Sequence, residues 1–249
     1  MKFFEATELG DDYLALMSDY DRFIREKVGA DYPYPLRMRD WELHQVLRRL
    51  PAVAGDWTML DTGSFNTYLG LWLARFGRHV VVSDLFGSRL RKSLLRQIRL
   101  LPRKATEAPF FAWRAALKRA ARNLEIRTID LTRIPYPDAA FDFITSVSVV
   151  EHIPAIERAL AEMYRCLKPG GRLLLTTDCG EAGKPYGDGV RYWTHPELQR
   201  LFAPYPVTSE ARAPDFRREN WCYHRDQPVL TAFVEITKPA AKTGAPAAR

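Results

Sequence analysis

Three aspartates, Asp61, Asp84 and Asp130, each stand directly after a short apolar run. Carboxylates at the ends of parallel strands lie along one rim of a sheet, where α/β proteins bind their ligands. Asp84 follows the first loop by about 20 residues, a spacing suited to binding the two hydroxyls of a ribose. Gly63 allows the backbone to approach a ligand closely. The pattern predicts a nucleoside cofactor at the loop Asp61-Thr62-Gly63.

The apolar pattern around these acids predicts alternating strands and helices. Strands are expected at residues 58–61, 79–84, 126–130, 141–150, 172–177 and 229–237, and helices within 8–50 and at 66–76, 156–167 and 195–202. The run His79–Asp84 has no polar alternation, which is typical of a strand buried on both faces. Thr194-x-x-Glu197 is a capping box that begins the last helix. We therefore predict a doubly wound, Rossmann-like α/β fold with a seven-stranded, mainly parallel sheet.

The same pattern predicts how the chain is divided. Residues 1–54 are expected to form an N-terminal helical cap, and residues 55–238 the α/β domain. A basic helical insertion, a lid, is expected at about residues 86–123. Residues 239–249 contain no core-forming side chains, so we expect a disordered tail there.

Composition and cysteine usage limit the class of protein. With 47% hydrophobic residues, the 249-residue chain can bury a sizeable core. The three cysteines, Cys166, Cys179 and Cys222, are far apart and form no CxxC pair, which argues against disulfides and zinc. No apolar run has the length of a membrane span, and the acidic N-terminus lacks a signal-peptide pattern. We expect a cytoplasmic protein without a metal and leave its oligomeric state open.

Four stretches of this sequence resemble the successive motifs of class I S-adenosylmethionine-dependent methyltransferases. They are LDTGSFNTYLG, VVVSD, IRTIDLTRIPYPDAAFDFITSVSVVEHI and ALAEMYRCLKPGGRLLLTT. The last two are similar to the small-molecule branch of that family. The resemblance covers roughly residues 55 to 180. It implies S-adenosylmethionine as the cofactor and methyl transfer as the reaction.

The resemblance also implies which residues bind the cofactor. They are Asp61, Thr62, Gly63, Phe65, Asp84, Leu85, Asp130, Leu131 and Ser146. In this family's arrangement, Asp61 and Gly63 hold the methionine end and Asp84 the ribose hydroxyls. Asp130 and the backbone N–H of Leu131 meet the adenine.

One loop departs from the family pattern. The family has acid-x-Gly-x-Gly-x-Gly, whereas this chain has only Gly63 of the three glycines. Phe65 places a bulky ring at the second glycine position, and we expect that ring to wall the methionine pocket. Asn66 tolerates positive φ and is expected to help the turn. A nicotinamide-binding domain would need a GxGxxG loop, which is missing.

His152 and Glu151 are the candidate catalytic residues. They are expected to follow the fourth strand, where cofactor and acceptor would meet. Histidine exchanges protons near neutral pH, so His152 could act as general base for an attacking hydroxyl. The alternative is that both residues only orient the next helix. Ser146, by the family resemblance, lies under the methionine moiety.

Positive charge is concentrated in the expected insertion. Residues 85–123 hold eleven basic residues and one acid, whereas the whole chain has a net charge of +7. Three interpretations stay open: a lid with solvated arginines, an electrostatic surface for an acidic acceptor or nucleic acid, or contact with an anionic membrane through residues 89–122.

The function predicted from the sequence is methyl transfer to a small molecule or glycan, with oxygen as the preferred acceptor atom. The stretch Ser146-Val147-Ser148-Val149 argues against nucleic acid as the substrate, since it lacks the Asn/Asp-Pro-Pro-aromatic signature typical of base amino methylation. Two alternatives remain. One is an RNA methyltransferase that uses the basic lid. The other is a non-catalytic partner protein that binds S-adenosylmethionine.

Overall fold

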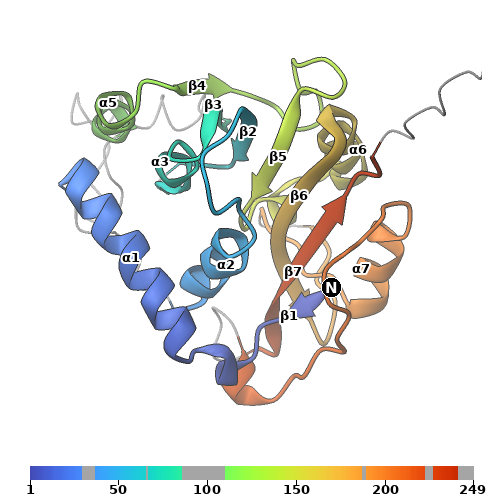
Figure 1. The fold of residues 1–249 in the computed structure, drawn as a ribbon. Coiled ribbons are helices and arrows are strands. Elements are labelled where there is room, and N and C mark those ends of the chain that lie inside the picture. The colour runs from blue at the N-terminus through green and yellow to red at the C-terminus, as the bar shows by residue number, and fades with distance from the viewer. Residues whose placement is uncertain (30–36, 66, 86–109, 187–188, 222–226, 241–249) are drawn as a thin grey trace, which may run out of the picture.

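A seven-stranded sheet runs through the molecule (Figure 1). The computed structural model describes residues 1–29, 37–65, 67–85, 110–186, 189–221 and 227–240. The strands are β1 (Lys2–Phe3), β2 (Trp57–Thr62), β3 (Gly77–Asp84), β4 (Leu124–Thr128), β5 (Phe141–Ser146), β6 (Leu167–Gly180) and β7 (Val229–Thr237). Their order across the sheet is β1-β7-β6-β5-β2-β3-β4. The predicted tail lies mostly in residues 241–249, outside the described part of the chain.

Strand direction confirms the predicted fold class. Strands β6, β5, β2, β3 and β4 are parallel, while β7 runs antiparallel to β6. From β2 the chain moves outward through β3 to β4, and then returns to the other side of β2 to form β5 and β6. The order therefore reverses between β2 and β5, and the crevice beyond their carboxyl ends is where such sheets bind ligands.

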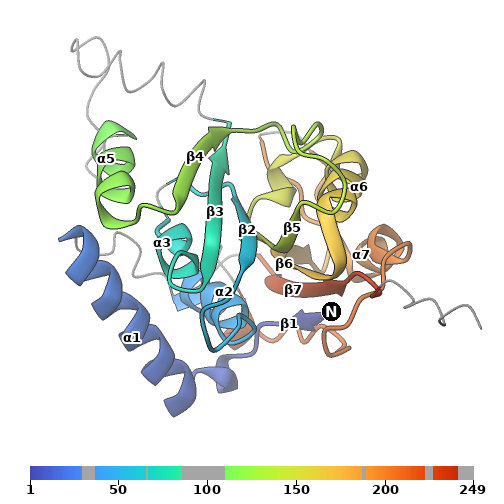
Figure 2. The same ribbon diagram turned by 45° about the horizontal axis from the view of Figure 1, so that its top comes forward.

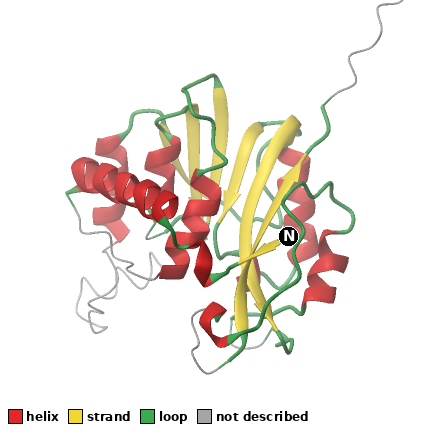
Figure 3. Cartoon of the chain, turned by 60° about the horizontal axis from the view of Figure 1, so that its bottom comes forward, coloured by secondary structure: helices red, strands yellow, loops and turns green. Residues whose placement is uncertain are grey.

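Helices cover both faces of the sheet (Figures 1 and 3). They are η1 (Ala6–Glu8), α1 (Asp11–Val28), α2 (Arg37–Leu47), α3 (Leu69–Leu73), α5 (Phe110–Ala120), η2 (Val150–His152), α6 (Ile156–Cys166), α7 (His195–Phe202) and η3 (Arg218–Asn220). One face carries α1, α2, α3 and α5, and the other carries α6 and α7 (Figure 2). The predicted capping box is present at the start of α7.

Side-chain alternation along the strands produces two separate cores. Phe143 of β5 packs in the core under α1, α2, α3 and α5, whereas its neighbour Ile144 packs in the core under α6 and α7. Each strand between two helical layers must be apolar on both faces, which explains the unbroken hydrophobic runs in the sequence.

The N-terminal segment does more than form the predicted helical cap. Lys2–Phe3 pairs with β7 and completes the sheet, a strand that the helical prediction missed. Helix α2 is fixed at its carboxyl end by Arg49, whose guanidinium contacts Glu235 of β7. Arg172 of β6 pairs with the same carboxylate and donates to the carbonyl of Arg49.

Helix α5 differs from the predicted lid. It connects β3 to the parallel strand β4 and packs against β4 and α1, which is the position of a crossover helix. Trp113 and Leu117 are buried in the core. The basic residues of its outer side are exposed: Arg114, Lys118, Arg119 and Arg122. Residues 86–109, with the remaining predicted lid and membrane-contact residues, lie outside the described part of the chain.

None of the helices among the described residues is long and apolar enough to cross a membrane.

Candidate functional site

Asp61 lies at the carboxyl end of β2 and is almost completely buried. Its Oδ1 accepts a hydrogen bond of 2.7 Å from Thr145 Oγ1 on the adjacent strand β5. Its Oδ2 is buried and has no hydrogen-bond partner among the residues that the structure describes. Burial raises the pKa of Asp61 to about 7; the hydroxyls of Thr145 and Ser64 oppose this rise, and the carboxylate of Asp84 adds to it. A buried acceptor of this kind is suited to a ligand that brings a donor or a positive charge.

The loop after Asp61 turns without the family's second and third glycines. Gly63 has φ +63°, the left-handed region that glycine adopts without strain. Ser64 is buried, and its Oγ donates to the Asp61 carbonyl over 2.8 Å. Thr67 then donates to the Ser64 carbonyl through both its N–H and its Oγ1, at 3.0 Å each. Hydrogen bonds from the hydroxyls of Ser64 and Thr67 therefore stabilise this turn, where the family pattern has the conformational freedom of two further glycines.

Phe65 and Asp84 meet at this loop. The backbone N–H of Phe65 donates to Asp84 Oδ2 over 3.1 Å, which brings two of the predicted cofactor-binding residues together. The Phe65 ring is buried and packs edge-on against Trp113 of α5, at 5.5 Å between centroids. The ring therefore contacts the crossover helix, and its place in the wall of a methionine pocket stays a prediction. Leu85, by contrast, is 58% exposed next to Asp84.

Asp130 does not end a strand as predicted. Strand β4 ends at Thr128, and Asp130 lies in the following turn, exposed to solvent. Its Oδ1 accepts from the N–H and Oγ1 of Thr132, at 2.9 and 2.8 Å, and these bonds lower the pKa of Asp130. The side chain of Leu131 is buried beside it. This turn still lies beyond the carboxyl end of β4, on the same rim as Asp84.

Ser146 is the last residue of β5, which is shorter than the predicted strand 141–150. Its hydroxyl is buried, and no group in the described part of the chain forms a hydrogen bond with it. Successive residues of a strand point to opposite faces, so Ser146 lies on the face of Ile144 and Asp61's partner Thr145 lies on the other. The two unpartnered oxygens, of Asp61 and of Ser146, therefore belong to opposite faces at the ends of neighbouring strands.

His152 and Glu151 lie in η2 rather than directly after a strand, a correction to the prediction. The His152 side chain is 52% exposed, and its Nδ1 lies 2.6 Å from the Gly189 carbonyl. A carbonyl oxygen only accepts, so Nδ1 must carry the proton and Nε2 is the basic nitrogen of the neutral ring. Glu151 is buried, accepts from Thr177 Oγ1 over 3.3 Å, and places Oε1 at 4.0 Å from His152 Nε2.

Sequence analysis missed two residues of this region, Thr145 and Gly189. Thr145 could have been found, since it lies next to Asp61 once β2 and β5 are paired in register. Gly189 could not, because it contributes only a carbonyl. One further contact brings in Glu42, whose buried Oε1 accepts from Ser148 Oγ over 2.7 Å.

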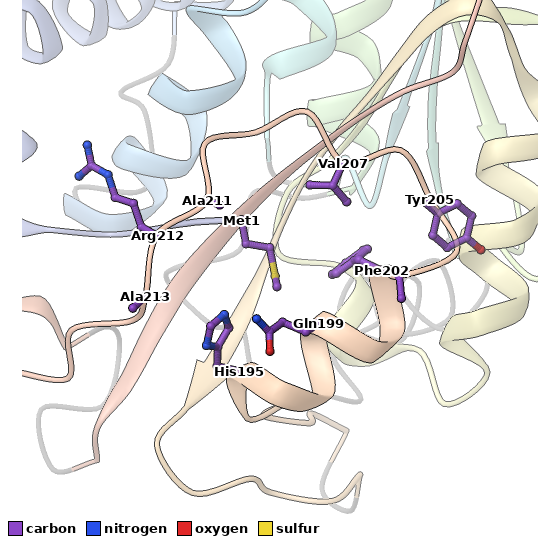
Figure 4. Close-up of a pocket in the computed structure, with 10 residues that line it drawn as sticks. Met1, His195, Gln199, Phe202, Tyr205, Val207, Ala211, Arg212 and Ala213 are labelled. Carbon is purple, nitrogen blue, oxygen red and sulfur yellow. The ribbon is translucent and has the colours of Figure 1, made fainter.

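A hollow of about 570 Å³ lies away from these residues, beside α7 and the segment that follows it (Figure 4). Its lining includes Met1, His195, Gln199, Phe202 and Arg212, none of which was predicted to bind the cofactor. We place the candidate site at the carboxyl ends of β2, β3 and β5, where Asp61 Oδ2 and Ser146 Oγ are buried without a hydrogen-bond partner among the described residues and Asp84 lies beside the loop. Among the described residues, no three His, Cys, Asp or Glu side chains are arranged to hold a metal ion.

Residues 60–175 match the sequence profile of a family described as "Methyltransferase domain". Among curated proteins, the chain is similar to the ubiquinone/menaquinone biosynthesis C-methyltransferase UbiE of Brucella anthropi. The two are 30% identical over 139 residues, which cover 55% of this chain and 46% of the relative. The chain thus spans about half the length of the curated relatives it matches.

Solved structures share the fold at low sequence identity. The [4+2]-cyclase SpnF has a TM-score of 0.55 and 16% identity, with 82% of this chain and 81% of that chain covered. A second structure is the 1,6-didemethyltoxoflavin-N1-methyltransferase of Burkholderia thailandensis, with bound 1,6-didemethyltoxoflavin and S-adenosylhomocysteine. Its TM-score is 0.53 at 19% identity, with 92% of this chain and 89% of that chain covered.

Replacement of Gly63 by alanine should be far more damaging than the same replacement at Gly29. Both glycines have nearly equal φ, +63° and +65°, but only Gly63 is enclosed. A Cβ there would lie 2.2 Å from Val149 Cγ2, whereas no atom of the described residues lies within 4 Å of a Cβ at Gly29. We expect Gly29→Ala to cost about 1 kcal/mol of unfolding free energy from backbone strain. Gly63→Ala should cost about 1–3 kcal/mol more. Equal losses in urea denaturation would contradict this geometry.

The pKa of Asp61 predicts a pH-dependent stability. An unfolded aspartate titrates near 3.8 and the folded one near 7, so between these values the folded protein holds a proton that the unfolded chain has lost. The free energy of unfolding should therefore fall as pH rises from 4 to 7, by about 1.4 kcal/mol per pH unit at most from this group. Asp61→Asn should remove this contribution. Denaturation curves of both proteins at several pH values test it, and an unchanged slope in the variant would refute it.

Proposed function

Because the chain belongs, through residues 60–175, to the class I S-adenosylmethionine-dependent methyltransferases, we propose that it transfers a methyl group from S-adenosylmethionine to a small-molecule acceptor. The observation that carries the proposal is the buried carboxylate of Asp61, with one oxygen unpartnered, beside the Gly63 loop and Asp84. S-adenosylmethionine, when bound, supplies a methyl group on a positively charged sulfur, which needs no further activation.

The residues present fit such a cofactor. The unpartnered Oδ2 of Asp61 is suited to accept from the ammonium group of the methionine end. The N–H of Phe65 donates to the carboxylate of Asp84, which is suited to accept hydrogen bonds from the ribose hydroxyls. Asp130 and Leu131 lie in the turn after β4 for the adenine. In this proposal Thr62, Gly63 and Leu85 contribute through the backbone, and Ser146 through its unpartnered hydroxyl.

We assign His152 as the general base. The Gly189 carbonyl fixes the proton on Nδ1, so Nε2 is ready to receive a proton from the acceptor. The buried carboxylate of Glu151, 4.0 Å from Nε2, stabilises the imidazolium that forms. Half of the ring is exposed, so an acceptor can reach it.

A base at this place indicates an acceptor atom that loses a proton on methylation. A hydroxyl oxygen of a phenol or a glycan satisfies this condition, which keeps oxygen as the first choice. An acidic ring carbon satisfies it as well, and the relative described as a C-methyltransferase makes carbon the second candidate. The [4+2]-cyclase shares this fold, so the fold alone does not specify methyl transfer.

Calorimetric titration with S-adenosylhomocysteine tests the cofactor site. The unaltered protein should bind it, and Asp84→Ala should weaken binding by about tenfold or more, since a bidentate acceptor for two hydroxyls is lost. Asp56→Ala is the matched control, because this aspartate pairs with Arg78 on the exposed surface. Absence of binding by the unaltered protein at high concentration would refute the proposed function. Binding without turnover on any acceptor would favour the non-catalytic alternative.

The role of His152 is tested by tritium transfer from methyl-labelled S-adenosylmethionine to a panel of quinols, phenols and sugars. With an acceptor that is methylated, His152→Gln should lower kcat by roughly 100-fold and leave S-adenosylhomocysteine affinity unchanged. His79→Gln, at a partly exposed histidine paired with Glu125, is the control. If His152→Gln retains kcat within about threefold, proximity alone accounts for the reaction.

A further inference from the structure

Glu42 is a completely buried carboxylate that comes from outside the matched methyltransferase region. It lies on α2, which packs against β6 and β7. Its Oε1 accepts a hydrogen bond of 2.7 Å from Ser148 Oγ, across 106 positions of the chain. Burial of a carboxylate costs free energy unless polar groups surround it. The presence of Glu42 at this buried place therefore points to a role beyond packing.

Ser148 is held in an unusual backbone conformation. Its φ is +49°, in the left-handed region that a residue with a Cβ adopts only at a cost. Two contacts hold it there: its N–H donates to Thr176 Oγ1 over 3.0 Å, and its hydroxyl donates to Glu42. Both are buried. Loss of either contact removes part of what maintains this conformation.

The next residue, Val149, packs against Gly63 of the cofactor loop. A Cβ added at Gly63 would lie only 2.2 Å from Val149 Cγ2. The backbone angle at Ser148 decides where Val149 lies, and Val149 in turn limits the position of Gly63. A sequence of contacts thus leads from Glu42 through Ser148 and Val149 to the loop beside Asp61.

We propose that Glu42 is a positioning residue, which shapes the cofactor loop through Ser148 and Val149 and so makes cofactor binding depend on the docking of α2. The inference rests on the proposed function. Glu42 need not touch the cofactor, because the loop is preorganised by the position of Val149. Docking of α2 therefore prepares the site before the ligand arrives, and the ligand does not have to order the loop itself.

Calorimetry with S-adenosylhomocysteine, together with the melting temperature, tests the inference on the full chain. Glu42→Ala and Ser148→Ala should each weaken binding by about tenfold. The double variant should be no weaker than the worse single one, since both remove the same contact. Glu42→Gln should bind within about threefold of the unaltered protein, because the amide oxygen still accepts from Ser148.

Asn123→Ala is the control, since the Asn123 side chain donates to the carbonyls of Ala74 and Gly77 near the amino ends of β3 and β4 and makes no bond to α2 among the described residues. It should lower the melting temperature and leave the affinity unchanged. Equal weakening by Asn123→Ala, or unaltered affinity in Glu42→Ala, would overturn the inference. If Glu42→Ala does not fold, Ser148→Ala decides the matter in the same way. Failure of the unaltered protein to bind would count against the proposed function instead.

Discussion

Burial of the Asp61 carboxylate is the constraint around which the site is built. Its Oδ1 accepts from Thr145 of β5, while its backbone carbonyl accepts from the hydroxyls of Ser64 in the loop and Ser83 of β3. Strands β2, β3 and β5 and the loop are therefore tied to one residue. An unpaired carboxylate in this position costs free energy, and the protein lowers that cost by hydroxyl donors and by a raised pKa. A ligand donor at Oδ2 would remove the remainder.

The site is also completed by a part of the chain that precedes the methyltransferase motifs. Glu8 connects three segments there, because it pairs with Lys2 of β1, Arg212 of a later loop and the indole N–H of Trp41 on α2. After the carboxyl end of α2, Arg49 pairs with Glu235. Held at Trp41 and at Arg49, α2 brings Glu42 to Ser148, just beyond the carboxyl end of β5. The methyltransferase motifs alone therefore lack some of the contacts that hold the site in place.

The sequence predicted which segments form strands more accurately than it predicted the residues at which those strands end. The β-branched run Val80–Val82 identifies β3, because a strand between two helical layers must be apolar on both faces. The run Phe141–Val150 predicts one strand, yet β5 ends at Ser146. Val147 and Val150 are apolar because they pack in the two cores, while Ser148 between them turns the backbone to positive φ. The hydrophobic pattern shows which residues are buried, but it does not show where the backbone changes direction.

The sequence by itself determined the α/β class, the acids beyond the strands and the family with its cofactor, since all three depend on residue types in a fixed order along the chain. Tertiary structure decided which groups meet. Asp61 and Thr145 lie 84 positions apart, and Glu42 and Ser148 lie 106 apart. His152 owes its tautomer to the Gly189 carbonyl, a group that every residue has. Such contacts leave no pattern in the sequence, because they arise only where the packing of the sheet and its helices brings distant segments within hydrogen-bond distance.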